Sequence, residues 1–567
     1  MSMSSGTSVG NAGGIRGKGS AAIGWGPGQG SGPLEGVLLP NGRAVRGIAD
    51  RLSLRPPQRQ ALELLDLLCG AGLPAKPGSG KLNLEDWVVK VTAALPAGHS
   101  FREFEREFVS LAFALATGVG KTRLMGAMVA YLHLLQGVNN FFVLAPNLTI
   151  YNKLIGDFQS NNPKYVLRGL PEFVIDPPRI VTGDDYADSN PDTARLFGSV
   201  VINVFNISKI NSEVRGGREP RIHKVEEVLG KSYFAYLQGL SDLVLFMDES
   251  HRYRASAGVR AINELRPRLG IELTATPYVE SNKGPVAFRN IVQNYPLSLA
   301  IDDGFVKVPA VVTRENFHPA GLSVPQLEKI KLEDGVRLHE SVKADLQTYA
   351  LESGRERVKP FMLVIARDTT HAAELLTLIE SPDFFGGQYV GKAIQIDYTA
   401  EDLMIERLLK IEKADEPTEI VIHVNMLKEG WDVTNLYTIV PLRAANARVL
   451  IEQTIGRGLR LPYGVRVGRP RKDAQGRPLA DPVDRLNIVA HDRFQEIIDE
   501  ANKDDSVLRI EKFELTEDGE VRREQVFVSQ PGSLGALGLS ANLSPLAEQQ
   551  GAEDQGGAAG TEGTAHP

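Results

Sequence analysis

Leu115-Ala-Thr-Gly-Val-Gly-Lys-Thr122 is the stretch that decides the fold of this chain. An apolar run from 108 to 115 leads into it, and apolar residues with helical spacing from 124 to 135 follow it. These patterns predict a strand that ends at the stretch and a helix that begins in it. A strand, a glycine-containing loop and a helix in this order indicate an α/β domain with a parallel sheet.

The residues of this loop suit phosphate binding. Small residues at Gly118 and Gly120 let backbone N–H groups close around phosphate oxygens, and the helix N-terminus adds partial positive charge. Lys121 is placed to reach the β- and γ-phosphates of a nucleotide, and Thr122 to offer a hydroxyl to Mg²⁺. Position 115 is Leu where the strict pattern has Gly, so a glycine-rich turn with a chance Lys-Thr is the alternative for this stretch alone. We expect nucleotide contacts at Thr117, Gly118, Val119, Gly120, Lys121 and Thr122.

A second block, Asp248-Glu249-Ser250-His251, follows a continuous apolar run from 243 to 247. The run predicts a strand buried on both faces of a parallel sheet, with the acidic pair at its carboxyl end, where such sheets bind ligands. Asp248 is placed to hold Mg²⁺, and Glu249 to orient and deprotonate an attacking water. An acidic pair after a strand is by itself more often a solvated turn, so this interpretation depends on the phosphate loop.

These two blocks and several further blocks follow one another in the order found in superfamily two helicases. The chain therefore resembles a helicase or translocase of the DExH group of that superfamily. The chain resembles DEAD-box RNA helicases less closely, because the third and sixth motifs of that family have amino-acid sequences that do not occur here. Three stretches are most similar in sequence to the motor (Res) subunit of type III restriction enzymes: residues 116–125, 426–435 and 456–462. The remaining blocks are Leu54-Arg-Pro-Pro-Gln58, Leu144-Ala-Pro-Asn147, Val201 to Ser208, Leu273-Thr-Ala-Thr-Pro277, Lys428-Glu-Gly-Trp-Asp432 and Gln453 to Arg460.

The second half of the chain repeats the alternation of strands and helices. Runs at 361–365, 419–424 and 438–442 are short and apolar, as in strands of a parallel sheet. We therefore predict an α/β fold with two tandem RecA-like, doubly wound parallel-sheet domains facing across an ATP cleft. The expected organisation is a disordered Gly/Ser-rich leader at 1–33, a helical segment with the Gln motif at 34–100, the first domain at 101–296, a connecting segment at 297–340, the second domain with a closing β-segment at 341–530, and a disordered acidic tail at 531–567.

The resemblance also implies roles for individual residues. Charge spreads over the equatorial oxygens during γ-phosphate transfer, and a cation supplied by the second domain stabilises it. Arg460 resembles this arginine finger, Arg457 a second phosphate contact and Gln453 a residue that positions water or phosphate; for either arginine the alternative is an interdomain salt bridge. Further nucleotide contacts are expected at Gln58, Gly430 and Asp432, coupling residues at His251, Thr274 and Thr276, and nucleic-acid contacts at Pro146, Asn147, Asn206, Ser208, Lys209 and Arg367.

Composition limits the kinds of partner. The net charge is −7, from 63 basic and 70 acidic residues, so any nucleic-acid surface must be local. Basic clusters at 215–224 and 466–472 are candidates, although Gly and Pro in both make a solvated insertion an equal alternative. The lone Cys69 excludes internal disulfides and cysteine-rich zinc modules. No run of eighteen apolar residues occurs, so we expect a cytoplasmic protein without a membrane partner.

The leading hypothesis is an ATP- and Mg²⁺-dependent helicase or translocase that moves on nucleic acid, with DNA favoured over RNA. Phosphate contacts carry no sequence information, so specificity is expected from a modification or recognition partner subunit. Two alternatives stay open: an ATPase switch gated by nucleic acid, and the motor half of a split restriction nuclease. A nuclease site in this chain is not expected, because the segment after Ala490 shows no arrangement of acidic residues and Lys that would hold a metal.

Overall fold

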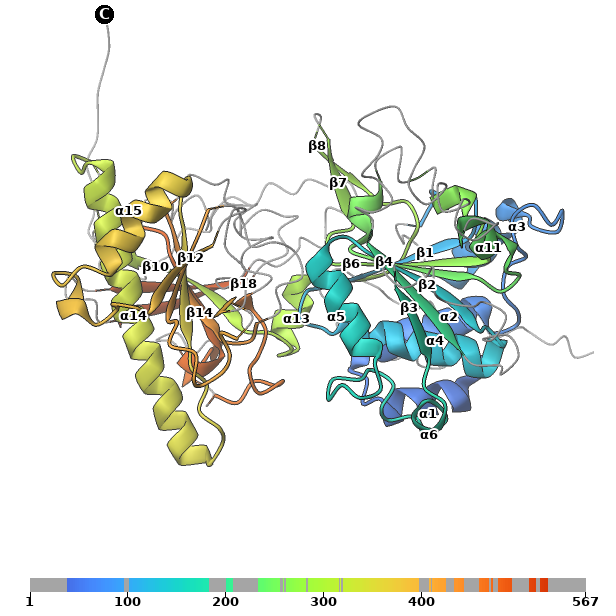
Figure 1. Ribbon diagram of the computed structural model, residues 1–567, viewed down its shortest axis with the longest axis horizontal. Helices are drawn as coiled ribbons and strands as arrows, with labels where there is room; N and C mark the ends of the chain where they lie inside the picture. Colours follow the sequence, from blue (N-terminus) through green and yellow to red (C-terminus); the bar gives the residue numbers. More distant parts are fainter. Residues whose placement is uncertain are drawn as a thin grey trace, which may run out of the picture. The chain divides into compact units, whose positions relative to one another are not determined.

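The computed structural model describes most of the chain between residues 38 and 528 (Figure 1). The described residues are 38–95, 101–182, 200–206, 233–254, 259, 262–281, 284–315, 317, 320–396, 407–408, 410–424, 433–442, 458–468, 471–472, 478–491, 509–515 and 521–528. Two large β-sheets, each with its own helices, account for most of these residues.

Seven strands of the described part form the first sheet, in the order β3-β4-β2-β5-β6-β1-β9. All neighbouring strands are parallel. Strands β1, β4, β5 and β6 are buried along their whole length, which explains why their sequences are mostly apolar. The strands are β1 (Ser110–Leu115), β2 (Asn140–Ala145), β3 (Arg179–Thr182), β4 (Val201–Asn206), β5 (Val244–Asp248), β6 (Leu269–Thr274) and β9 (Ile291–Tyr295).

Helices α1, α2 and α4 pack against one another beside this sheet, and α5 packs on β2 and β4 (Figure 1). Helix α2 starts with two prolines, which suit the first turn of a helix because the N–H groups there have no partner within the helix. The other elements of this part are α3, α6 and α11, the 3-10 turn η2 and the hairpin β7–β8. Their bounds are α1 Gly42–Arg51, α2 Pro56–Cys69, α3 Leu84–Ala94, α4 Lys121–Gln136, α5 Leu148–Phe158, α6 Pro171–Ile175, α11 Tyr233–Gly239, η2 Ser250–Tyr253, β7 Tyr278–Ser281 and β8 Gly284–Ala287.

The second sheet has the order β12-β13-β11-β14-β17-β10-β18-β19. Its neighbours are parallel up to β18, and β19 closes the edge as the antiparallel arm of a hairpin. Helix α13 (Leu297–Asp302) follows the first sheet and precedes β10. The strands are β10 (Val308–Arg314), β11 (Phe361–Ile365), β12 (Ala393–Ile396), β13 (Ile420–His423), β14 (Leu436–Pro441), β17 (Arg485–Val489), β18 (Arg509–Leu515) and β19 (Val521–Val528).

The long helix α14 (Val324–Ser353) covers part of the second sheet, with contacts to β11, β14 and β17. It begins at a capping box formed by Ser323 and Gln326 and ends at Gly354, whose φ of +66° is left-handed. Gly335 faces the sheet so closely that a Cβ there would lie 2.4 Å from Cγ2 of Val440. Helix α15 (Thr369–Ile379) lies against β12 and β13, and the short elements η3 (Phe385–Gly387), β15 (Arg471–Lys472), β16 (Pro478–Leu479) and η5 (Pro482–Asp484) complete this part.

The predicted α/β fold with two largely parallel sheets is confirmed, as are the strands expected at 243–247, 361–365 and 438–442. The alternation after residue 508 forms the hairpin β18–β19, and β18 pairs with β10. One boundary differs from the expectation. Strand β10, within the expected connecting segment at 297–340, lies inside the second sheet. It does so because the apolar run at 308–312 is buried between β17 and β18.

The expected leader at 1–33 and the expected tail at 531–567 lie outside the described residues. Within the part that the structure describes, no helix combines the length and apolar character needed to cross a membrane.

Candidate nucleotide site

The loop between β1 and α4 requires glycine at two positions. Gly118 and Gly120 have φ values of +82° and +104°, a region that glycine enters without steric cost. Space is restricted as well: a Cβ at Gly118 would lie 2.8 Å from Cγ1 of Val306, and one at Gly120 would lie 2.6 Å from Nε2 of Gln58. Helix α4 then begins at Lys121. The backbone therefore has the turn and the helix N-terminus that the sequence predicted.

Gln58, the expected adenine contact, is buried against the same loop. Its Nε2 donates to the carbonyl of Gly120 at 2.8 Å, and its Oε1 accepts from the backbone N–H of Arg55 at 2.8 Å. The side chain thus links the start of α2 to the loop. Its contact with a nucleotide base stays a prediction.

Two basic residues beside the loop were not among the predicted site residues. Arg55 donates through Nη1 to the carbonyl of Gly118 and through Nη2 to the carbonyl of Gly464, both at 2.8 Å. Burial lowers the pKa of the Arg55 guanidinium, and the neighbouring Arg123 lowers it further. On α5, the Nζ of Lys153 lies 3.3 Å from the hydroxyl of Thr122.

Arg55 could have been found from the sequence, because it stands inside the Leu54–Gln58 block. Lys153 could not, because it sits in an ordinary helical pattern with no motif around it. Only the packing of α5 next to α4 brings it to the loop.

The acidic pair lies at the carboxyl end of β5, facing the loop. Nζ of Lys121 is 3.3 Å from Oε1 of Glu249. Burial and the adjacent Glu249 raise the pKa of Asp248 to about 6, while Lys121 and Lys153 act in the opposite direction. Glu249 has a φ of +50°, which is uncommon for a residue with a side chain and is concentrated at functional sites. The structure thus brings together Lys121, Thr122, Asp248 and Glu249.

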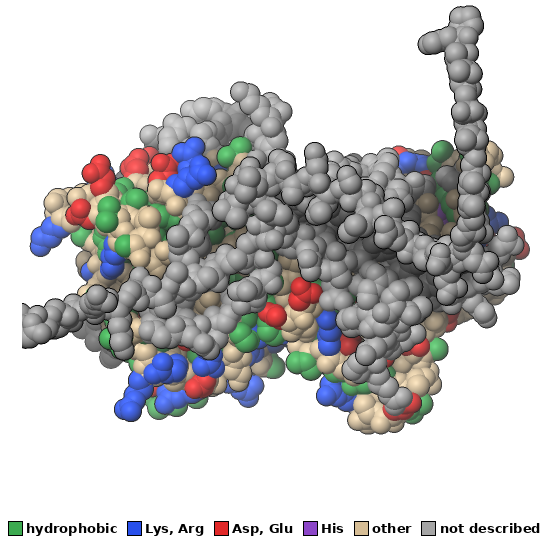
Figure 2. Space-filling view, turned by 180° about the vertical axis from the view of Figure 1, so that it is seen from behind, with side chains coloured by type: hydrophobic (Ala, Val, Ile, Leu, Met, Phe, Trp, Pro, Cys, Tyr) green, Lys and Arg blue, Asp and Glu red, His purple; other side chains and the backbone are tan. Residues whose placement is uncertain are grey.

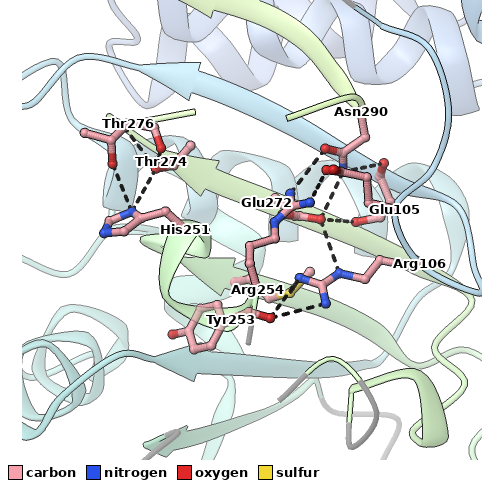
Figure 3. A network of polar contacts seen from close by, with 11 residues as sticks. Glu105, Arg106, His251, Tyr253, Arg254, Glu272, Thr274, Thr276 and Asn290 are labelled. Atoms are coloured by element: carbon pink, nitrogen blue, oxygen red, sulfur yellow. Dashed lines mark hydrogen bonds and ion pairs between the residues drawn. The ribbon is translucent and has the colours of Figure 1, made fainter. Parts of the chain in front are cut away.

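His251 connects Glu249 to the end of β6, and Figure 3 shows its contacts with Thr274 and Thr276. Its Nδ1 is 3.3 Å from the hydroxyl of Thr274, 3.0 Å from that of Thr276 and 3.7 Å from Oε2 of Glu249. The Thr274 hydroxyl in turn accepts from the Thr276 N–H at 3.1 Å. The three expected coupling residues therefore form one connected set of contacts.

Arg460 is the predicted site residue of the Gln453 to Arg460 block that lies within the described residues. A Cβ at Gly118 would lie 3.7 Å from Cγ of Arg460, so the side chain runs beside the phosphate loop. Burial lowers the pKa of the Arg460 guanidinium to about 10, and the carboxylates of Glu249 and Glu412 oppose this change. The predicted residues Gln453, Arg457, Gly430 and Asp432 lie outside the described residues.

The expected nucleic-acid contacts that are described have partners within the protein. Asn147, next to Pro146, caps α5 by accepting from the N–H of Ile150 at 3.0 Å. Asn206 is buried at the end of β4, and Arg367 forms an ion pair with Glu328. Figure 2 shows Lys and Arg side chains mixed with Asp, Glu and apolar side chains on the face seen from behind. Ser208 and Lys209 lie outside the described residues.

A separate group has donor atoms close enough for a metal ion: atoms of His339 and Glu340 on α14 and of Glu419, just before β13, lie within 4.8 Å of one another. Lysines neutralise both carboxylates. Nζ of Lys343 is 2.9 Å from Glu340 and 2.8 Å from Glu419, and Lys392 is 3.0 Å from Glu419. We therefore interpret the group as an ion-pair network on the helix α14.

Comparison with known proteins shows that the first part of this chain is similar to subunits of restriction enzymes. Residues 51–279 match the family model described as the type III restriction enzyme, res subunit. The Res subunit of the EcoPI type III restriction-modification enzyme of Escherichia phage P1 is 28% identical over 137 residues. That match spans 23% of this chain and 13% of the phage protein.

Solved structures show weaker likenesses. A fragment of a putative HsdR subunit of a type I restriction enzyme from Vibrio vulnificus YJ016 has a TM-score of 0.41 at 15% identity, covering 84% of this chain and 75% of that one. The DNA-bound type ISP enzyme LlaBIII scores 0.39 at 14% identity, covering 67% and 26%. Dbp5 from S. cerevisiae, bound to RNA and ADP BeF3, scores 0.41 at 12% identity, covering 83% and 96%. Scores this low carry no argument about function.

Proposed function

We propose that this chain, a DExH-type helicase relative that resembles the Res subunit of type III restriction enzymes, hydrolyses ATP to drive movement on nucleic acid, with DNA favoured over RNA. The observation that carries the proposal is the meeting of the β1–α4 loop with the acidic pair, at 3.3 Å between Lys121 and Glu249. Glu249 has a left-handed backbone conformation and faces Lys121 of the loop. This placement suits a site in which a base lies opposite a phosphate.

The chemistry follows from the positions of these groups. N–H groups of the loop and the N-terminus of α4 bind the phosphate oxygens, and Lys121 leaves Glu249 to pair with the terminal phosphate. Glu249 is thereby released to accept a proton from the attacking water. His251, held between Glu249 and the two threonines, links this event to the end of β6.

The oxygen donors of Thr122 and Asp248 fit a magnesium ion. Mg²⁺ prefers hard oxygen ligands and is held in nucleotide sites by one or two protein oxygens together with phosphates. Burial raises the pKa of Asp248 to about 6, because the charged form of a buried carboxyl group is disfavoured. A cation bound beside it would favour that charged form. When bound, the ion would neutralise charge on the phosphates.

Arg460, at the end of the Gln453 to Arg460 block, completes the proposed site. Its side chain runs beside Gly118, and the carboxylate of Glu249 is the first of the charges that favour its protonated form. A guanidinium in this place can stabilise the charge that develops during γ-phosphate transfer.

A partner protein is part of the proposal. The phage relative is one subunit of a restriction-modification enzyme, and the match spans 13% of its length. We propose that a modification, recognition or nuclease subunit supplies the sequence specificity that phosphate contacts cannot provide.

The first experiment is steady-state ATP hydrolysis by the purified chain, alone and with single-stranded DNA, duplex DNA, single-stranded RNA or duplex RNA. Glu249→Gln serves as the control for contaminating ATPases. Strong stimulation by DNA supports the proposal, and a strand-displacement assay on the same DNA then separates a helicase from an ATPase switch. Turnover that none of the four polymers changes would contradict the nucleic-acid part of the proposal.

A further inference from the structure

A buried network of charged side chains lies directly beside the His251 contacts (Figure 3). Its centre is Glu272 on β6, whose side chain is 0% exposed. The carboxylate accepts a hydrogen bond from the Ser110 hydroxyl of β1 at 2.8 Å and from Nδ2 of Asn290 at 3.0 Å. A fully buried carboxylate in the middle of a sheet is costly unless such donors and cations surround it.

Two arginines supply the positive charge. Nη2 of Arg254 lies 2.6 Å from Oε2 of Glu272, and Nε of Arg106 lies 3.6 Å from Oε1. Arg254 also pairs with Glu105, and its guanidinium stacks 3.7 Å from the centre of the Phe288 ring. Burial alone would raise the pKa of Glu272, but the two guanidiniums and the neighbouring donors hold it below its usual value.

The network joins the two segments that carry the coupling residues. Arg254 directly follows the η2 turn, which contains His251. Both Nη atoms of Arg106 point to the carbonyl of Tyr253 at the end of that turn, at 3.4 and 3.5 Å. On the other segment, Glu272 stands two positions before Thr274 on β6, so both side chains share one face of the strand.

We propose that this network is a positioning element for coupling, an inference that rests on the proposed function. Because Arg254 and Arg106 hold the turn to β6 through Glu272, a displacement of Glu249 and His251 during ATP turnover is passed to Thr274 and Thr276. Without the network, the turn moves on its own and the displacement is absorbed locally. The network therefore determines how strongly nucleic acid stimulates ATP hydrolysis, while the groups that bind and cleave ATP remain intact.

Two variants test the inference, chosen so that the charges stay balanced in the protein interior. Arg254→Lys keeps the positive charge but cannot contact Glu272, Glu105 and Asn290 together or stack flat on Phe288. The double variant R106Q/E272Q removes one positive and one negative charge and leaves the Arg254–Glu105 pair. It serves as the second test if the first variant folds poorly.

The chain offers a matched control in the exposed ion pair between Arg289 and Glu103. These residues lie next to Asn290 and near Glu105, and the pair spans 2.6 Å with both side chains more than half exposed. Glu103→Gln therefore removes an ion pair close in the sequence to Glu105 and Asn290 without removing any side chain of the network. Exposed pairs of this kind contribute little to stability, so the control should fold and behave as the wild type.

The measurement is the ratio of ATP turnover with and without the stimulating polymer, together with KM for ATP and the melting temperature. We expect both test variants to keep basal kcat and KM within about twofold and to lose on the order of fivefold or more of the stimulation ratio, the lower range of allosteric coupling. The Glu103→Gln variant should keep the wild-type ratio. A merely structural role would lower the active fraction and scale basal and stimulated turnover together, leaving the ratio unchanged.

The outcomes separate the inference from the proposed function. A stimulated wild type with folded test variants that keep the full ratio would overturn the inference alone. A wild type that hydrolyses ATP but responds to no polymer would overturn the nucleic-acid part of the proposed function and the inference with it. Loss of the ratio in Glu103→Gln as well would also overturn the inference, because a surface change beside the network would then have the same effect as a change within it.

Discussion

Glu249 occupies a backbone conformation that residues with side chains rarely adopt. Its φ and ψ of +50° and +53° are left-handed, at a cost of about 1–2 kcal/mol relative to ordinary conformations. The conformation ends β5 abruptly and starts the η2 turn, so Glu249 faces Lys121 while His251 reaches Thr274 and Thr276. The strain therefore serves the placement of the proposed base.

The proposed roles of the loop lysine and the glutamate predict opposite defects. Glu249→Gln keeps the size of the side chain but cannot accept the proton, so turnover should fall by about 10²-fold or more with ATP binding retained. Lys121→Ala should lose binding as well as turnover, because the phosphates lose their cation. Fluorescent-nucleotide titration with steady-state turnover measures both effects. Normal turnover by Glu249→Gln would rule out this residue as the base.

Arg460 is expected to act in the transition state. Arg460→Ala should lower kcat by on the order of 10³-fold, the effect of losing an arginine finger, with little change in nucleotide binding. Arg460→Lys should rescue little, because a lysine cannot reproduce the forked contacts of a guanidinium. The measurement is single-turnover hydrolysis at saturating ATP. Unchanged rates in Arg460→Ala would leave Arg457 as the better candidate for the finger.

Helix α14 shows how tightly an element can depend on one glycine. At Gly335 a Cβ would lie 2.4 Å from Cγ2 of Val440 and 3.1 Å from Sδ of Met362, so the helix backbone packs directly on side chains of the sheet there. Gly47 in helix α1 is the opposite case, with nothing within 4 Å of the position of its Cβ. Glycine is therefore required by close packing at Gly335 but not at Gly47.

This contrast predicts stability changes of opposite sign. Gly335→Ala should destabilise the protein by about 1–3 kcal/mol, the usual cost of overpacking. Gly47→Ala, the matched control, should stabilise it by up to about 1 kcal/mol because alanine favours the helix. Urea unfolding midpoints of the two variants check the prediction. A destabilised Gly47→Ala would mean that helix propensity does not decide the outcome at that position.

Asp334 makes the second sheet sensitive to acid. Its fully buried carboxylate pairs with Arg314 at 2.6 Å and His491 at 2.8 Å, and although burial alone would raise its pKa, these partners hold the pKa of Asp334 below its usual value. A lowered pKa in the folded state gives stability that is complete above the unfolded value of about 3.9 and is lost as the pH falls through the folded value.

The corresponding variant isolates this contribution. Asp334→Asn should destabilise the protein at pH 7 by about 3–5 kcal/mol, because Arg314 remains buried without its partner. Its stability should then change less than that of the wild type as the pH is lowered below about 4. Urea unfolding at pH 7 and at acid pH provides the comparison. A parallel acid loss in both proteins would assign the effect to other carboxylates.

At the scale of the whole molecule, labelling of Cys69 can measure how often the folded core opens, because Cys69 is the only cysteine in the sequence. It is buried in the core shared by α2 and the first sheet, and burial raises the pKa of its thiol to about 12. A protonated and buried thiol reacts slowly, since the thiolate is the nucleophile.

The prediction concerns its labelling by a thiol reagent at pH 7. The native protein should resist labelling, unfolded protein should react at once, and a bound non-hydrolysable ATP analogue should slow the native rate further by stabilising the folded state. Time courses with and without the analogue test this, with Lys121→Ala as the variant in which the analogue has no effect. Rapid labelling of the native chain would show that this core opens readily.

Sequence patterns alone determined the fold class and the nucleotide-loop motif of this protein. Runs such as 243–247 are apolar throughout because their strands are buried on both faces, and the loop needs glycines because its backbone is left-handed at Gly118 and Gly120. Both properties are local, so they can be recognised in the order of the residues.

Only the tertiary structure decided which distant residues meet. Lys153 approaches Thr122 because α5 packs beside α4, and β10 belongs to the second sheet because β17 and β18 flank it. The network around Glu272 draws its charges from three separate segments, and nothing in any one of them marks a partner. Contacts of this kind depend on how elements pack, which is why a charged residue inside an apolar strand could be explained only after the fold was known.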